Sequence, residues 1–155
     1  MMFGIFGGKH KELNADIDNA LSHARDELNK NTPEGRKVAF NLLIPVLEKA
    51  REKGFEGRDL EMFTLLGDIY TQSEDWAQAL NAYGDGISAN NGKGIGNEHL
   101  HFRLGKCYFE LGEQDRAADE LCRAYMGGGK QIFDNENPRY FEFLKTKIQP
   151  GPGGW

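Results

Sequence analysis

Two segments of the chain, residues 60–87 and 98–125, share one spacing of small and aromatic residues. In each segment, a Leu-Gly pair is followed by an aromatic residue three positions after the glycine and by an alanine twelve positions after it. The matched residues are Leu66, Gly67, Tyr70 and Ala79 in the first segment and Leu104, Gly105, Tyr108 and Ala117 in the second. An internal repeat of this length indicates an array of stacked helical units, and it favours binding over catalysis as the function.

Each repeat is predicted to be two helices joined by a short turn. The first repeat covers 58–89 and the second covers 97–126. Their helices are expected at about 58–72, 76–89, 97–111 and 114–125. The shared glycine and alanine positions let the two helices of a pair approach closely, and the aromatic residues fill the space between neighbouring helices.

The residues before the repeats predict a further helical pair over 11–53. Over about 11–29, apolar residues recur at steps of three and four, as in an amphipathic helix. They are Leu13, Ile17, Leu21, Ala24 and Leu28. This pair lacks Leu-Gly, so it is interpreted as a degenerate first repeat, as terminal repeats often are.

The second helix of that pair is expected over 33–53. Thr32 is predicted to be its N-cap, Pro33 its first residue and Gly54 its C-cap. Pro45 lies inside it and predicts a kink in the preceding turn, near residues 41–44, because a proline removes one helical hydrogen bond.

A glycine-rich linker follows the second repeat, and the last helix is predicted over 138–148. We expect this helix to cap the array by packing on Leu121 and Tyr125. Arg139, Lys145 and Lys147 give the same helix a basic side, which is a second candidate surface for binding a partner, besides the groove described below. The tail over 149–155 is expected to be flexible, with Trp155 either folding back or docking into a partner.

The repeat pattern resembles the tetratricopeptide repeat, a 34-residue helix–turn–helix unit. Phe63 and His101 take the place of the family's tryptophan, and the period here is 38 residues, from Gly67 to Gly105. The proline that usually closes a repeat is missing. The resemblance implies one all-α domain over 1–155, a short α-solenoid of antiparallel helix pairs in a tetratricopeptide-like superhelix with a C-terminal capping helix.

Charge and composition exclude several classes of protein. The net charge is −5 with no basic block, which argues against a nucleic-acid partner. No apolar run is long enough for a membrane span, and the N-terminal apolar stretch is too short for a signal peptide. Cys107 and Cys122 form no CxxC pair. They favour a reduced, cytoplasmic protein, with a disulfide between adjacent helices as the alternative.

Motifs for catalysis, cofactors and metals are not found. The glycine-rich segment Gly92–Gly96 lacks the last glycine of a dinucleotide-binding motif and a preceding strand. His99 and His101 are two positions apart, so they point to different faces of a helix, and His101 is expected to be packed. We therefore expect no enzyme, no cofactor and no metal site. An enzyme would need a cluster such as His101, Asp68 and Cys107.

The resemblance also implies where a partner binds, because the first helices of tetratricopeptide repeats line a concave groove. The matching positions here are Glu61, Thr64, Asp68, Thr71 and Gln72 in the first repeat and His99, Phe102, Lys106, Phe109 and Glu110 in the second. Phe102 and Phe109 share a helix face and are expected to be exposed anchors. The alternative is that the N-terminal pair or the tail covers them. The groove is expected to be mixed in charge, with Glu61, Asp68 and Glu110 against Lys106, and its acidic excess suits a basic peptide or protein surface.

The function expected from these features is non-catalytic binding of a protein or peptide. One such role is that of an immunity protein that blocks the active site of a bacterial toxin, by analogy with small repeat proteins. The alternative is an adaptor or assembly chaperone of a secretion or envelope complex. Self-association is a further hypothesis, because a short solenoid can hide an open end by forming a homodimer.

Overall fold

The computed structural model describes residues 4–54, 57–90, 92 and 96–155, with the backbone alone for 4–7, 9 and 10. These residues form α-helices and one short 3-10 helix, and no strand occurs in the described ranges. The elements are α1 (Gly4–Asn29), α2 (Pro33–Lys53), α3 (Asp59–Gln72), α4 (Trp76–Ala89), α5 (Glu98–Glu110), α6 (Gln114–Gly128), η1 (Lys130–Phe133) and α7 (Pro138–Lys145). The all-α prediction is confirmed.

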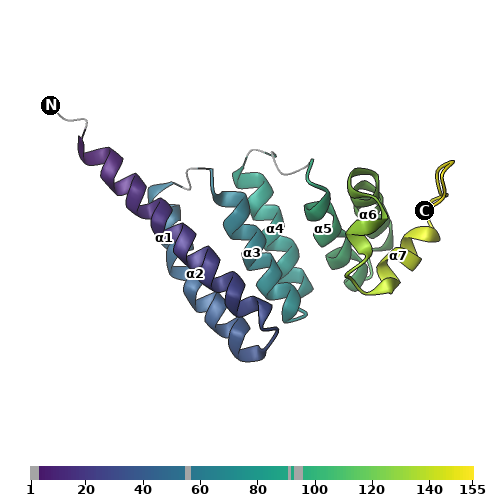
Figure 1. The fold of residues 1–155 in the computed structure, drawn as a ribbon, viewed down its shortest axis with the longest axis horizontal. Helices are drawn as coiled ribbons and strands as arrows, with labels where there is room; N and C mark the ends of the chain where they lie inside the picture. The colour runs from purple at the N-terminus through teal and green to yellow at the C-terminus, as the bar shows by residue number, and fades with distance from the viewer. Residues whose placement is uncertain (1–3, 55–56, 91, 93–95) are drawn as a thin grey trace.

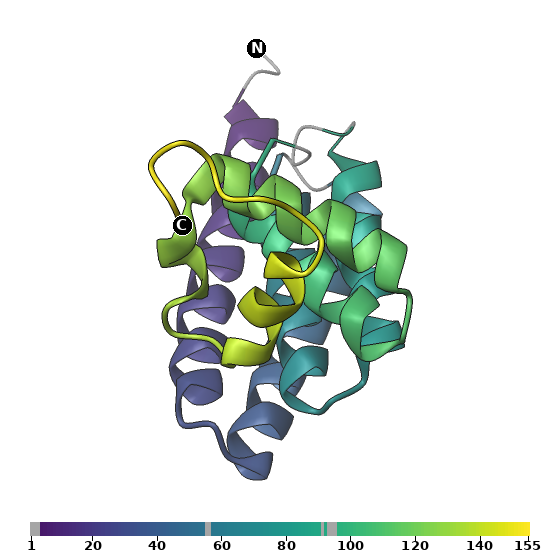
Figure 2. The same cartoon turned by 90° about the vertical axis from the view of Figure 1, so that its right-hand side faces the viewer.

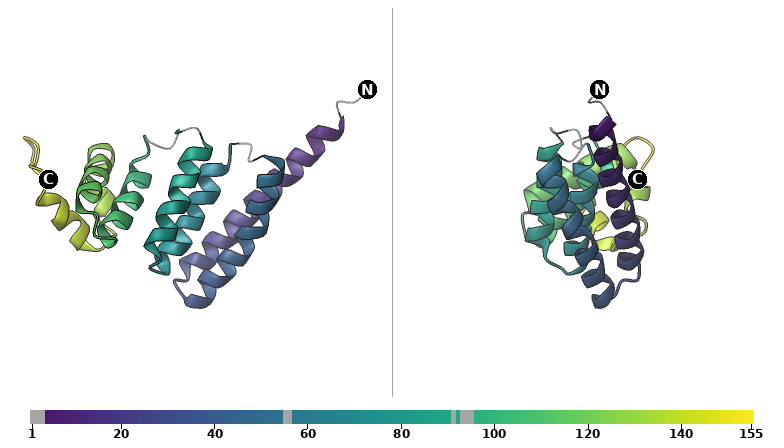
Figure 3. Two further views of the ribbon diagram at one scale, coloured as in Figure 1. Left: turned by 180° about the vertical axis from the view of Figure 1, so that it is seen from behind. Right: turned by 90° about the vertical axis from the view of Figure 1, so that its left-hand side faces the viewer.

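Adjacent helices pack as pairs in chain order. The pairs α1/α2, α3/α4 and α5/α6 make the largest contacts, and they stand side by side along the long axis of the molecule (Figure 1). The view from behind shows the same order, with α7 at one end and α1 at the other (Figure 3). Each helix pair also contacts the next one, through α2 and α3 and through α4 and α5.

Local signals at the ends of α2 act as the sequence predicts. The side chain of Thr32 accepts a hydrogen bond from the Gly35 amide at 3.0 Å, and Pro33 begins the helix. Gly54 ends it with a φ of +84°, a conformation that favours glycine. The helix runs without a break through Pro45, whose side chain faces solvent. The missing hydrogen bond therefore interrupts neither the helix nor its buried face.

The glycines of the repeat signature lie where two helices touch. A Cβ on Gly67 would overlap the ring of Tyr83, and a Cβ on Gly105 would lie 2.7 Å from the Leu121 side chain. At both positions a Cβ would come too close to a carbon atom of the facing helix, so only glycine fits there. Ala79 and Ala117 are fully buried in the facing helices. The predicted role of the small residues in close helix packing is confirmed.

Three clusters of buried side chains form the core. The largest joins α1, α2 and α3, and it includes Ile17, Leu43 and Met62, all fully buried. A second surrounds Tyr83 and Cys107 between α4 and α5. The third lies between α5, α6, η1 and α7 and includes Leu121, Phe133 and Leu144. The core therefore continues from each helix pair to the next.

The C-terminal region differs from its prediction. Helix α6 continues to Gly128, so the expected linker is partly helical, and Gly129 turns the chain with a φ of +67°. The unpredicted η1 follows and places Phe133 in the core. Figure 2 views this end, with α7 and the tail in front of α5 and α6. The extra turn of chain lets η1 and α7 pack on the last pair together.

The tail folds back instead of extending loosely. The Gly154 amide donates a hydrogen bond to the Gly151 carbonyl at 2.9 Å. The Trp155 ring lies 5.8 Å from that of Tyr125 and 5.5 Å from that of Phe141, both edge-on. Edge-to-face contacts of this kind stabilise aromatic pairs. Of the two alternatives for Trp155, the structure therefore shows the one in which it folds back onto the chain.

Replacing Gly67 by alanine tests the close packing of α3 on α4. The new methyl group overlaps Tyr83, and such overpacking should lower the free energy of unfolding by about 1–3 kcal/mol. Gly84, also helical, has no atom within 4 Å of its would-be Cβ. Gly84→Ala should therefore raise stability by about 0.5–1 kcal/mol. Urea unfolding followed by circular dichroism measures both; equal effects of the two variants would contradict this packing.

Candidate functional site

Two open pockets lie next to each other on the odd-numbered helices. The N-terminal pocket has a volume of about 430 Å³ and the C-terminal pocket about 450 Å³. The N-terminal pocket is lined by Arg25, Leu28, Asn29, Leu60, Glu61, Thr64, Leu65, Asp68, Asn97, Leu100 and Arg103. The C-terminal pocket is lined by Leu28, Asn29, Asp68, Thr71, Gln72, Tyr83, His99, Phe102, Arg103, Lys106, Ile132 and Glu136. The two pockets share Leu28, Asn29, Asp68 and Arg103 and therefore adjoin, and we call them together the groove.

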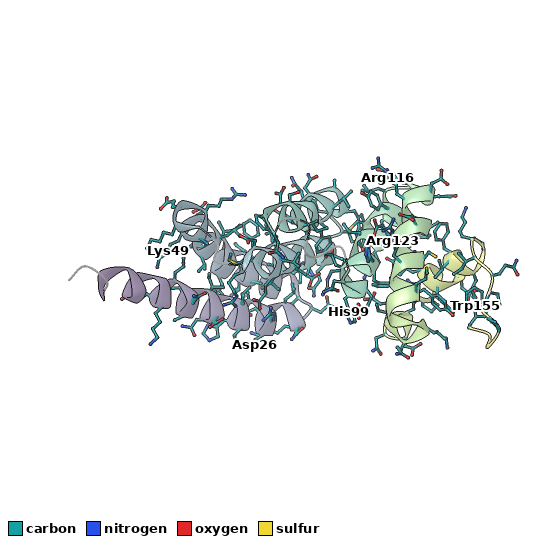
Figure 4. All side chains as sticks on the ribbon, turned by 90° about the horizontal axis from the view of Figure 1, so that it is seen from above. Asp26, Lys49, His99, Arg116, Arg123 and Trp155 are labelled. Atoms are coloured by element: carbon teal, nitrogen blue, oxygen red, sulfur yellow. The ribbon has the colours of Figure 1, made fainter. Side chains whose placement is uncertain are left out.

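Helices α1, α3 and α5 supply most of the groove. Ile132 and Glu136, from η1 and the segment after it, close its C-terminal end. Figure 4 shows His99 of α5 on the same side of the molecule as Asp26 of α1, and Arg116 of α6 on the opposite side. The groove therefore opens on the side of the molecule that carries α1 and the start of α5.

Most of the residues predicted from the repeat offsets line the groove. Glu61, Thr64 and Asp68 line the N-terminal pocket, and Asp68, Thr71, Gln72, His99, Phe102 and Lys106 line the C-terminal pocket. Phe109 and Glu110 do not line either pocket. Glu110 instead accepts a hydrogen bond from the Tyr140 hydroxyl at 2.6 Å and pairs with Arg139.

The expectation that Phe102 and Phe109 are exposed anchors is wrong. Phe102 is 5% exposed, and its ring lies edge-on to that of Phe133 at 5.0 Å. Phe109 is half-buried against Tyr140 and Phe143, at 5.3 and 5.1 Å. Neither the N-terminal pair nor the tail makes these contacts. They come from η1 and α7, whose own aromatic residues are buried by covering this side of α5.

A charged network crosses the groove between its two pockets. Arg103 donates to both carboxylate oxygens of Asp68, from Nε at 2.7 Å and from Nη2 at 3.0 Å. The Tyr83 hydroxyl donates to the same Asp68 at 2.7 Å and lies 3.0 Å from the Thr71 hydroxyl. A two-point contact between guanidinium and carboxylate fixes both orientation and distance. The network thus links α3, α4 and α5.

Burial and the hydrogen bonds of the network shift the pKa values of Tyr83 and Arg103. Burial raises the pKa of Tyr83 well above its ordinary value, and the negative charge of Asp68 adds to the shift. Burial alone would lower the pKa of Arg103, but the hydrogen bonds that it donates to Asp68 and the negative charge of Asp68 outweigh burial and raise that pKa. The raised pKa values keep the Tyr83 hydroxyl neutral and the Arg103 guanidinium charged at neutral pH.

The groove is mixed in charge, as expected, but it lacks the predicted excess of acids, because bases pair with them. Arg25 donates to Glu61 at 2.7 Å. Lys106 donates to Glu136 at 2.7 Å. Burial would raise the pKa of Glu61, but hydrogen bonds from Arg25 and Arg58 outweigh it and hold that pKa below its ordinary value. The acids lining the groove therefore meet the positive charge of neighbouring helices.

Arg103 is the main groove residue that the repeat offsets missed. It aligns with Leu65 of the first repeat, a core position, so the comparison of repeats gave no reason to select it. Its spacing carried a signal, because it lies four residues after His99 and three before Lys106. Residues at these spacings share one face of a helix.

The side chains considered for a catalytic cluster have other partners. Asp68 binds Arg103 and Tyr83, as described, and Nδ1 of His101 lies 2.5 Å from Glu120. Cys107 is fully buried, and burial raises its pKa to about 12. Cys107 and Cys122 are free thiols rather than a disulfide. Within the described ranges, His, Cys, Asp and Glu side chains nowhere gather in a group of three or more suited to a metal.

A scan against protein-family models and a search of curated proteins gave no match to this chain. A search of the described helices found none long and apolar enough to cross a membrane.

Thiol labelling tests the burial of Cys107. A thiol with a pKa of about 12 has almost no reactive thiolate at neutral pH, and Cys107 is also shielded from reagent. In native protein at about pH 8, iodoacetamide should label Cys122 and leave Cys107 unmodified, and urea should make both reactive. Mass spectrometry of tryptic peptides gives the two rates, and comparable native rates would show that this part of the core is open.

Proposed function

We propose that this chain is a non-catalytic binding module of the tetratricopeptide type, acting in the cytoplasm. In this proposal the three helix pairs form a short superhelix capped by α7, and the groove takes a segment of a partner protein. The observation that carries the proposal is that two adjoining pockets are lined mainly by α1, α3 and α5. These helices correspond to those that line the binding face in the family that the repeat resembles.

The size and lining of the groove support this use. Each pocket lies within the roughly 300–1,000 Å³ typical of ligand sites. The lining mixes apolar side chains with hydroxyl, amide and charged groups from three helices. An extended segment lying across the three helices would contact both pockets at once. Both expected roles, immunity protein and adaptor or assembly chaperone, use such a surface.

A matched pair of substitutions tests the groove as the binding site. Asn29 is exposed and lines both pockets, whereas Asn81 is exposed on α4, away from the groove. Asn29→Trp should obstruct both pockets, and Asn81→Trp adds the same bulk elsewhere. We expect the first variant to lose at least about 90% of a partner captured from the native host, corresponding to at least about 1.4 kcal/mol of binding free energy.

The measurement is quantitative mass spectrometry of proteins that co-purify with the tagged chain and its two variants. A partner counts as groove-bound when Asn29→Trp loses it and Asn81→Trp retains it. Circular dichroism checks that both variants keep their helices. If every captured partner is retained equally by the two variants, the groove is not the binding site.

A further inference from the structure

The charge and the apolar floor of the groove restrict what it can bind. We propose that the groove takes an uncharged extended peptide segment that places one large apolar side chain in the N-terminal pocket. This inference rests on the proposed function and names the chemistry of the partner. It replaces the basic partner expected from the sequence.

The apolar side chain is assigned from the leucines of the N-terminal pocket. Leu60 of α3 is half-buried and lines this pocket together with Leu28, Leu65 and Leu100, each of which is only 4–6% exposed. The C-terminal pocket also has apolar lining, from Leu28, Phe102 and Ile132, but it exposes more polar and less apolar surface than the N-terminal pocket. Apolar surface is best covered by apolar surface, so the anchor of the segment belongs over the leucines.

We infer that the bound segment is uncharged because the charged side chains of the groove already pair with one another. In the N-terminal pocket, Arg25 and Arg103 balance Glu61 and Asp68, and each base contacts one of these acids. In the C-terminal pocket, Arg103 and Lys106 balance Asp68 and Glu136 in the same way. These charges are already partnered within the chain.

A charged side chain entering the groove would therefore find little net attraction. It would lose water without gaining an unpaired opposite charge, or it would have to break an existing pair. Both are unfavourable for a buried ion, whereas an uncharged side chain meets neither cost. Pairing inside the groove thus selects against strongly acidic and strongly basic segments alike.

In the N-terminal pocket, two polar side chains remain available to bind the backbone of the segment. Asn29 is exposed and Thr64 is half-buried, and neither makes a side-chain hydrogen bond within the described residues. An amide offers both donors and an acceptor, and a hydroxyl can do either. These groups match the alternating N–H and C=O groups of an extended backbone, which carry no charge.

Selection from a random peptide library tests this chemistry directly. The full-length chain is immobilised and offered phage-displayed peptides of about twelve residues, roughly 40 Å long when extended. Selected peptides are synthesised, and their Kd is measured at about 0.05 M and about 0.5 M NaCl. Screening of exposed charges increases strongly over this range, so the ratio of the two Kd values reports the contribution of charge.

We expect the selected peptides to share a large apolar residue flanked by uncharged residues. Their Kd should change less than about twofold between the two salt concentrations. Thr64→Tyr, which fills the N-terminal pocket from its wall, should weaken binding at least about tenfold, whereas Asn81→Tyr, which adds a tyrosine on α4 outside the groove, should bind as the wild type does. Asn29→Trp provides a second blocking variant should Thr64→Tyr fail to fold.

Other outcomes overturn the inference in distinguishable ways. If selection converges on acidic or basic peptides that are lost with Thr64→Tyr, the groove binds peptides but the assigned chemistry is wrong. Weakening of about tenfold or more at the higher salt concentration has the same meaning. If no peptide is selected, or if binding ignores both Thr64→Tyr and Asn29→Trp, the proposed function fails together with this inference.

Discussion

The contact between Tyr83 and Gly67 connects the packing of the helices to the groove. Tyr83 is fully buried, and its ring occupies the space that a side chain at position 67 would need. This position brings the Tyr83 hydroxyl to Asp68, and Asp68 in turn binds Arg103 of the next helix pair. One glycine thus lets α4 approach α3 closely enough for its tyrosine to orient an ion pair between α3 and α5. The boundary between the two pockets depends on that pair.

Local signals and the repeat predicted the helices well because they depend on neighbouring residues. The Thr32 cap and the two signature glycines required only short-range spacing and a partner helix within the same pair. The C-terminal region was harder to predict. The positive φ of Gly129 and the return of η1 over α5 depend on packing against helices already in place. For the same reason, a helical pattern alone did not distinguish an exposed Phe102 from one covered by Phe133.

Groove positions were predicted better than groove charge. The offsets of the repeat identify the face of a helix, which is a local property. The partner of each acid belongs to another helix: Arg103 is 35 residues from Asp68, and Arg25 is 36 residues from Glu61. Counting acids along the predicted face therefore gave an acidic surface, although the neighbouring helices neutralise it. In the binding role that we propose, recognition by this groove would depend on shape and apolar contact, because its charges already pair with one another.

Chemical-shift mapping by NMR tests the central claim, that the groove on the odd-numbered helices is the binding surface. A labelled full-length chain is titrated with a bound peptide or partner, and the backbone amide shifts are followed. The account predicts the largest shifts in α1, α3 and α5, around Asn29, Thr64 and Arg103. Shifts concentrated on the outer faces of α2, α4 and α6, with those three positions unchanged, would contradict it.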